Sequence, residues 1–181
     1  MGKKYFIFDL DNTLVKTNRA NNKSYEEAIK AVTGMGIEYR HKKPRFTRMD
    51  LSLALPYLSP SQISEIIKLK EDFYIRHLQE TALNVQLVKC LKLLKNSGEE
   101  TILLTECRKV RAQQICNYYT LGQFFSRQYY FEDYNGIGKY QYLKTQNVPL
   151  DSVILFENEK AEIRKAKRFG IPKNQIITIK I

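Results

Sequence analysis

No run of apolar residues in this chain of 181 residues approaches the length of about 20 that a membrane-spanning helix needs. Before Asp9 the only apolar run is residues 5–8, which is too short for the hydrophobic part of a secretory signal. These two absences argue against a membrane protein or a secreted one. They predict a cytoplasmic protein without a membrane partner.

Cysteine, glycine and proline are also scarce. The three cysteines, Cys90, Cys107 and Cys116, are an odd number and include no C-x-x-C pair, which argues against a disulfide framework or a thiolate metal site. Eight glycines and five prolines are too few for a fibrous chain, and 43% hydrophobic residues are too many for a disordered one. We therefore expect a globular protein with reduced thiols.

Acidic residues are few relative to basic ones: 19 Asp and Glu against 30 Lys and Arg, a formal net charge of +11. Such a charge favours anionic partners, from phosphorylated metabolites to nucleic acid. Because the basic residues are spread along the chain, we interpret most of them as a solvated surface. A small phosphorylated substrate is the expected partner, and nucleic acid is the lesser alternative.

From residue 98 onward, short apolar segments alternate with amphipathic ones, which is typical of βαβ units in a parallel sheet. We expect strands at residues 4–8, 101–104, 129–131, 153–156 and 176–179. Helices are expected at residues 84–95, 110–118, 139–145 and 160–169. The predicted fold class is α/β, with a Rossmann-like parallel sheet as the core.

The segment between the first two strands of this pattern has mainly helical periodicity, interrupted by a basic loop expected at residues 42–48. Helices are expected there at residues 24–32, 49–58 and 63–78. We therefore predict a small helical domain, residues 18–81, inserted into a core domain formed by residues 1–17 and 82–181.

Polar residues follow the predicted strands at the edge where parallel sheets bind ligands. They are Asp9, Asp11, Thr105 and Asn158. Lys139 is the first residue of the predicted helix that precedes the strand before Asn158. One carboxylate can attack phosphorus, and a second can act as general acid and base. Mg²⁺ would offset the repulsion between the two, while a hydroxyl and an ammonium would hold phosphoryl oxygens.

Each of these residues also has a purely structural interpretation. The two aspartates can belong to a turn, and Thr105 can be the N-cap of a helix. Lys139 can be a solvated helix residue, and the acidic residues at 157–159 can favour the positive end of the helix that follows. The functional interpretation depends on their convergence from separate segments.

Four segments resemble the motifs of the haloacid dehalogenase-like superfamily, in the same order. The segment FDLDNTLV at residues 8–15 is similar to its first motif, and ILLT at residues 102–105 to its second. Gly138-Lys139 resembles the third, and residues 153–171 resemble the fourth. The resemblance spans nearly the whole chain and implies that the helical insert is a C1-type cap.

The resemblance implies a role for each matched residue. Asp9 would be the nucleophile and a Mg²⁺ ligand, and Asp11 would be the general acid and base with its backbone carbonyl on the metal. Thr105, Glu106 and Lys139 would bind the phosphoryl group. A carboxyl group at Asp11 favours phosphate-ester hydrolysis over dehalogenation.

The fourth motif departs from the family pattern. Asn158 stands where an aspartate metal ligand is usual, and Glu162 where a second aspartate is common. An amide oxygen can coordinate Mg²⁺ but brings no negative charge. Glu157 or Glu162 is the candidate to supply the missing charge as a metal ligand.

We predict Mg²⁺-dependent removal of phosphate from a small phosphate monoester through an aspartyl-phosphate on Asp9. The substrate stays open among phosphosugars, nucleotides and phosphorylated cofactors. Two alternatives also stay open. One is a phosphomutase of the same fold, and the other is a binding module without turnover, which Asn158 and the net charge of +11 favour.

Overall fold

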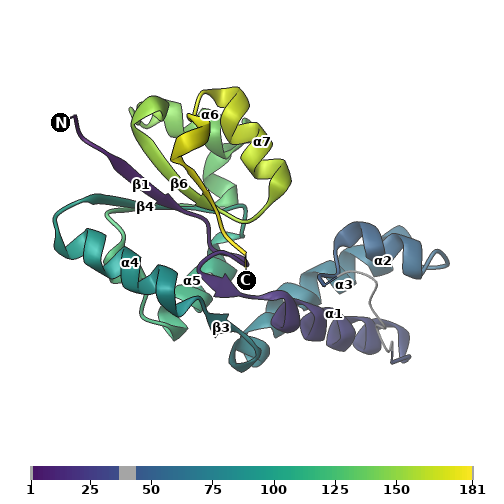
Figure 1. The fold of residues 1–181 in the computed structure, drawn as a ribbon. Coiled ribbons are helices and arrows are strands. Elements are labelled where there is room, and N and C mark those ends of the chain that lie inside the picture. Colours follow the sequence, from purple (N-terminus) through teal and green to yellow (C-terminus); the bar gives the residue numbers. More distant parts are fainter. Residues whose placement is uncertain (1, 37–43, 181) are drawn as a thin grey trace. The chain divides into compact units, whose positions relative to one another are not determined.

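The structure is a computed structural model that describes residues 2–36 and 44–180 (Figure 1). The chain divides into two compact units. We call residues 1–16 and 83–181 the core unit, and residues 17–82 the helical unit. Where the chain passes from one to the other, the short strands β2 (Val15–Lys16) and β3 (Ala82–Leu83) pair with each other.

The core unit contains a parallel sheet with the strand order β5-β4-β1-β6-β7. Its strands are β1 (Tyr5–Phe8), β4 (Glu100–Leu104), β5 (Arg127–Tyr129), β6 (Val153–Glu157) and β7 (Ile176–Thr178). In register, Phe8 lies between Leu103 on β4 and Phe156 on β6. The central strand β1 therefore ends between its two neighbours, and the residues that follow it face the ends of both.

Helices cover both faces of this sheet (Figure 1). They are α4 (Val85–Asn96), α5 (Lys109–Tyr118), α6 (Lys139–Thr145) and α7 (Lys160–Phe169). Ile7, Ile102 and Leu155, one from each central strand, are almost fully buried in one cluster. Strands buried on both faces consist of near-continuous apolar runs, and each such side chain stabilises the fold by about 1.5–3 kcal/mol. The predicted α/β fold class is confirmed.

The helical unit contains α1 (Asn18–Thr33), α2 (Arg48–Ala54), α3 (Pro60–Phe73) and a 3₁₀ helix at Tyr74–Glu80. Local sequence sets the helix ends. Thr47 and Ser59 begin α2 and α3 with capping boxes, and Gly34 ends α1 with a left-handed φ of 71°. Residues of α1, α2 and α3 pack in one apolar cluster.

Several predicted boundaries are wrong. The helix expected at residues 24–32 starts at Asn18, because Asn21 donates to the carbonyl of Phe46 (2.9 Å) and Asn22 accepts from its N–H (2.9 Å). These long-range hydrogen bonds offset the low helix propensity of asparagine.

Further helices and strands also differ from their predicted bounds. The helix expected at residues 49–58 ends at Ala54, and the one at residues 63–78 changes to a 3₁₀ helix after Phe73. The strand expected at residues 129–131 is instead Arg127–Tyr129, and the one expected at residues 176–179 ends at Thr178. No helix among the described residues is long and apolar enough to cross a bilayer.

Candidate active site

Asp9 is the residue immediately after the central strand β1. Its N–H donates to the carbonyl of Phe156 on β6 (3.1 Å), which holds the backbone at the sheet edge. The side chain is buried, with 6% of the residue exposed. One carboxylate oxygen accepts from the Thr13 hydroxyl (3.1 Å), and the other lies 3.7 Å from the Lys139 ammonium.

A tight turn after Asp9 brings Thr13 back beside it. Asn12 has a φ of 56°, a left-handed conformation that asparagine tolerates better than most residues. The N–H groups of Thr13, Leu14 and Val15 all lie within 3.2 Å of the Leu10 carbonyl. The sequence DNT therefore builds the turn that aims a hydroxyl at the Asp9 carboxylate.

Lys139 is the first residue of α6 and is buried to 2% exposure. Its ammonium lies 2.7 Å from Glu157, 3.6 Å from Glu162 and 3.7 Å from Asp9. Burial opposes the charge on this amine, but Asp9 and Glu157 outweigh it and raise the pKa of Lys139 well above its usual range. The alternative that Lys139 is a solvated helix residue is wrong.

For the Asp9 carboxyl, unlike the Lys139 ammonium, the surroundings favour the neutral form. Burial, followed by the negative charge of Glu157, raises its pKa well above the usual range, although Lys139 and Thr13 act in the lowering direction. A carboxylate must be ionised to attack phosphorus. The site therefore favours a further positive charge close to Asp9 when it acts.

Glu157, the last residue of β6, is almost fully buried and uses both carboxylate oxygens. One oxygen accepts from the backbone N–H groups of Asn158 (2.9 Å) and Glu159 (3.0 Å), and the other binds Lys139. It thus favours the start of α7, as the structural interpretation expects, and also fixes the Lys139 ammonium. The sequence pattern predicts a helix-start residue or a substitute metal ligand at Glu157, and it does not indicate the contact with Lys139.

Asn158 is half-buried, and its amide oxygen accepts from the same Thr13 hydroxyl (3.0 Å) that donates to Asp9. A hydroxyl has one hydrogen, so two oxygens converge on one donor. Mg²⁺ takes oxygen ligands, commonly one or two carboxylates together with substrate phosphate. Asp9 and Asn158 fit that ion in donor type, with Asp9 as the anionic member.

The described residues include no group of three or more His, Cys, Asp and Glu placed to hold a metal ion. Glu162 is directed to lysines: one carboxylate oxygen binds Lys165 at 2.6 Å and the other lies 3.6 Å from Lys139. An ion at Asp9 would therefore depend on amide and backbone oxygens as well as on carboxylate.

Asp11 and Thr105 lie at the same edge of the sheet. The Asp11 carboxylate lies 3.4 Å from the guanidinium of Arg111 on α5. Thr105 follows β4, the neighbour of β1, and its buried hydroxyl accepts from the N–H of Cys107 (3.1 Å). The N-cap of α5 is Arg108, so the alternative that Thr105 caps that helix is wrong.

Glu106 has an exposed side chain next to Thr105. Because its carboxylate would repel a phosphate, only its backbone N–H suits an anion there. The structure thus brings Asp9, Lys139 and Asn158 together around Thr13 and Glu157, and places the other predicted residues at the ends of neighbouring segments.

The sequence pattern of haloacid dehalogenase-like hydrolases matches residues 6–175. The chain belongs to this family. A search of curated proteins returns no significant match.

Solved structures show the same fold. A Thermotoga maritima protein assigned as a β-phosphoglucomutase has a TM-score of 0.74 at 19% identity, over 98% of this chain and 86% of its own. A predicted phosphatase from Clostridium acetobutylicum has a TM-score of 0.74 at 16% identity, over 98% and 85%. CbbY from Rhodobacter sphaeroides, in complex with phosphate, has a TM-score of 0.72 at 16% identity, over 94% and 84%.

In this haloacid dehalogenase-like protein, we expect Lys139→Met to destabilise the fold strongly. The change leaves the carboxylates of Asp9, Glu157 and Glu162 without their shared cation, at a cost of about 3–5 kcal/mol. Urea unfolding measures the loss. Lys144→Met on the exposed side of α6 is the control and should change stability by less than about 0.5 kcal/mol. Equal effects of the two changes would contradict the assigned role of Lys139.

The raised pKa of Asp9 predicts a pH-dependent stability. The Asp9 carboxyl binds its proton more tightly in the folded chain than in the unfolded chain. Its contribution to the free energy of unfolding is therefore fully present below about pH 4 and is lost as the pH rises through the pKa of the folded state. With a chelator present to remove metal ions, the stability of Asp9→Asn relative to the unmodified chain should therefore increase as the pH rises from about 4 to about 7. Urea unfolding across that range checks the trend, and a constant difference between the two proteins would refute it.

Proposed function

We propose that this chain removes phosphate from small phosphate monoesters, with Asp9 as the nucleophile and Mg²⁺ as the cofactor. The observation that carries the proposal is a buried carboxylate at the end of the central strand, with the Lys139 ammonium near one oxygen and the Thr13 hydroxyl, which also contacts the Asn158 amide oxygen, at the other. Family membership supports a hydrolase of this fold.

The reaction has two steps. Asp9 is the nucleophile in the first step and the leaving group in the second, and Asp11 acts first as the acid and then as the base. An Asp9 oxygen bonds to phosphorus while the bond to the ester oxygen breaks, and the Asp11 carboxylic acid gives its proton to that oxygen. Asp11 then takes a proton from a water whose oxygen attacks phosphorus. The bond from Asp9 to phosphorus breaks, and inorganic phosphate leaves with both carboxyl groups restored.

The remaining site residues bind and orient the phosphoryl group. The Lys139 ammonium and the Thr105 hydroxyl face its non-bridging oxygens, together with the backbone N–H of Glu106. Mg²⁺ would be held by the Asp9 carboxylate, the Asp11 carbonyl and the Asn158 amide oxygen, and supplies positive charge that keeps Asp9 ionised.

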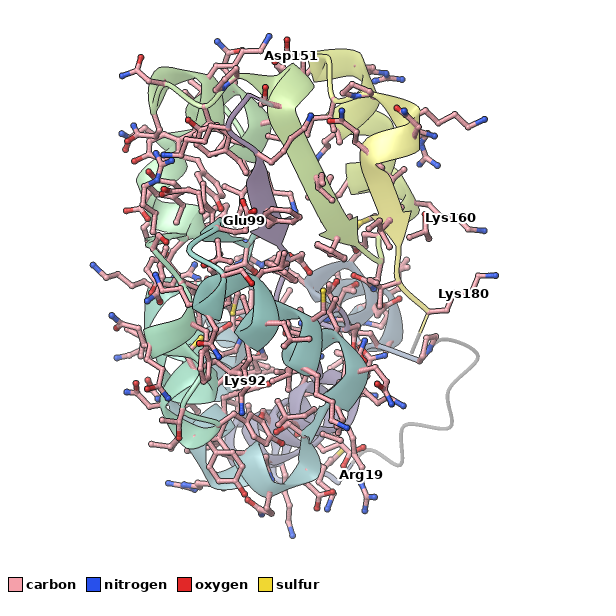
Figure 2. All side chains as sticks on the ribbon, turned by 60° about the vertical axis from the view of Figure 1, so that its left-hand side comes forward. Arg19, Lys92, Glu99, Asp151, Lys160 and Lys180 are labelled. Carbon is pink, nitrogen blue, oxygen red and sulfur yellow. The ribbon has the colours of Figure 1, made fainter. Side chains whose placement is uncertain are left out.

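Residues 18–81 form the cap domain in this proposal, and residues 1–17 and 82–181 form the catalytic domain. The cap contributes substrate selection, as inserted helical domains do when they exclude water from a site. The expected substrate is a small cytoplasmic phosphorylated metabolite. Basic side chains such as Lys160 on α7 and Lys180 after β7 extend away from the ribbon (Figure 2), which favours a dispersed charged surface over a nucleic-acid stripe.

A panel of phosphorylated metabolites, with and without Mg²⁺, tests the activity by release of inorganic phosphate. Asp9→Asn should abolish turnover, and Asp11→Asn should reduce it by about 10²–10⁴-fold. Asp151→Asn, which changes an exposed aspartate, should leave turnover unchanged. Phosphate release that survives in Asp9→Asn would refute the nucleophile. An isomerised sugar phosphate without free phosphate would indicate a phosphomutase.

A second candidate function is binding of a phosphorylated ligand without turnover. Asn158 favours it, because an amide lowers the negative charge available for Mg²⁺. If the chain is an active hydrolase with a weakened metal site, Asn158→Asp should tighten Mg²⁺ binding about tenfold. Isothermal titration with Mg²⁺ measures the change. If neither protein binds Mg²⁺ or releases phosphate from the panel, the result favours the binding module over the hydrolase.

A further inference from the structure

Arg111 is a buried basic residue that the reaction described above does not use. It is the third residue of α5, and only 8% of it is exposed. Its neighbours Arg108 and Lys109 are exposed. Arginine is seldom buried unless its charge is paired, and a long side chain near a helix end can usually reach water. The burial of this guanidinium therefore requires a specific partner.

Among the described residues, the carboxylate of Asp11 is such a partner. The Nη2 atom of Arg111 lies 3.4 Å from Oδ2 of Asp11, a residue 100 positions earlier in the chain. The two side chains are 10% and 19% exposed. A pair in such a poorly solvated place interacts more strongly than one on the surface.

The guanidinium is also anchored from the other side. Nε of Arg111 donates to the sulfur of Cys107 (3.0 Å), and the N–H of Cys107 donates to the hydroxyl of Thr105 (3.1 Å). Cys107 is itself 1% exposed. A line of contacts thus runs from the end of β4 through Cys107 and Arg111 to the loop after β1.

We propose that Arg111 is the positioning residue for Asp11. It holds the acid–base carboxylate at the edge of the sheet, while Lys139 holds the nucleophile Asp9. The proposal rests on the proposed function for the role of Asp11, and on the structure for the pair itself. A displacement of about 1 Å at a reacting group can cost about 10²-fold in rate, so a fixed carboxylate matters to turnover.

The planar guanidinium suits this role better than an ammonium. It donates in fixed directions, so one N–H can remain on Cys107 while another faces Asp11. A lysine at the same position would retain the charge but would lose that two-sided anchoring. Arg111→Lys should therefore restore only part of what Arg111→Met removes.

The pair can be tested without any substrate. Urea unfolding of Arg111→Met, Asp11→Asn and the double variant forms a double-mutant cycle. We expect the double variant to be markedly more stable than the sum of the two single losses predicts. Additive losses would overturn the proposal, because they would mean that the two side chains do not interact. If Arg111→Met does not fold, Arg111→Gln, which also removes the charge, takes its place in the same cycle.

Kinetics of the Mg²⁺-loaded chain test the consequence for catalysis. With a substrate from the phosphate panel, Arg111→Met should lower kcat about 10–100-fold and change KM less than twofold, and Arg111→Lys should recover part of kcat. Arg108→Met, at the exposed start of α5, is the matched control and should retain full activity. In the Asp11→Asn background, Arg111→Met should add no further loss.

The other outcomes separate the competing explanations. A raised KM with unchanged kcat would overturn the positioning role and would indicate that Arg111 binds the substrate phosphate directly. An unchanged kcat and KM would overturn it as well. If the unmodified chain shows no turnover while the unfolding cycle still shows coupling, the proposed hydrolase function fails and the restraint on Asp11 is supported.

Discussion

The buried ammonium of Lys139 is the constraint on which the polar edge of the core unit depends. A cation that is 2% exposed needs countercharges nearby, and three carboxylates lie within 3.7 Å of it. They come from Asp9 after β1, Glu157 at the end of β6 and Glu162 on α7. Separation of these elements would leave a charge without compensation in the interior. The arrangement that suits phosphoryl chemistry is therefore also a condition for folding.

Much of the core could be predicted, because its signals are local. The bounds of α6 and α7 agree with the predicted helices, since Gly138 precedes the first and Gly170 ends the second with a φ of 108°. The parallel order of short apolar strands explains why Asp9 and Asn158 both reach the Thr13 hydroxyl. By contrast, the true start of α1 depends on hydrogen bonds to Phe46, whose position a local pattern does not contain.

The parts of the site that escaped prediction involve charged residues with two partners. Glu157 fits a helix start on local grounds, and only the fold shows that its second oxygen binds Lys139. Arg111 adjoins Ala112 and Ile115 on the buried side of α5. A basic residue next to an apolar stripe can indicate from the sequence that its side chain is buried. Asp11 lies 100 positions away, so sequence spacing alone does not identify it as a partner.

The pairing of β2 with β3 has a consequence for how such a protein can be altered. The chain leaves the core unit at Lys16 and returns to it at Leu83, and these two crossing points belong to strands that are hydrogen-bonded neighbours. Because the ends are already held together, replacing the 66-residue helical unit by a segment of another length changes the entropy of loop closure only slightly. The fold thus provides an insertion point where a whole domain can be exchanged while the strand register beneath Asp9 and Asn158 is preserved.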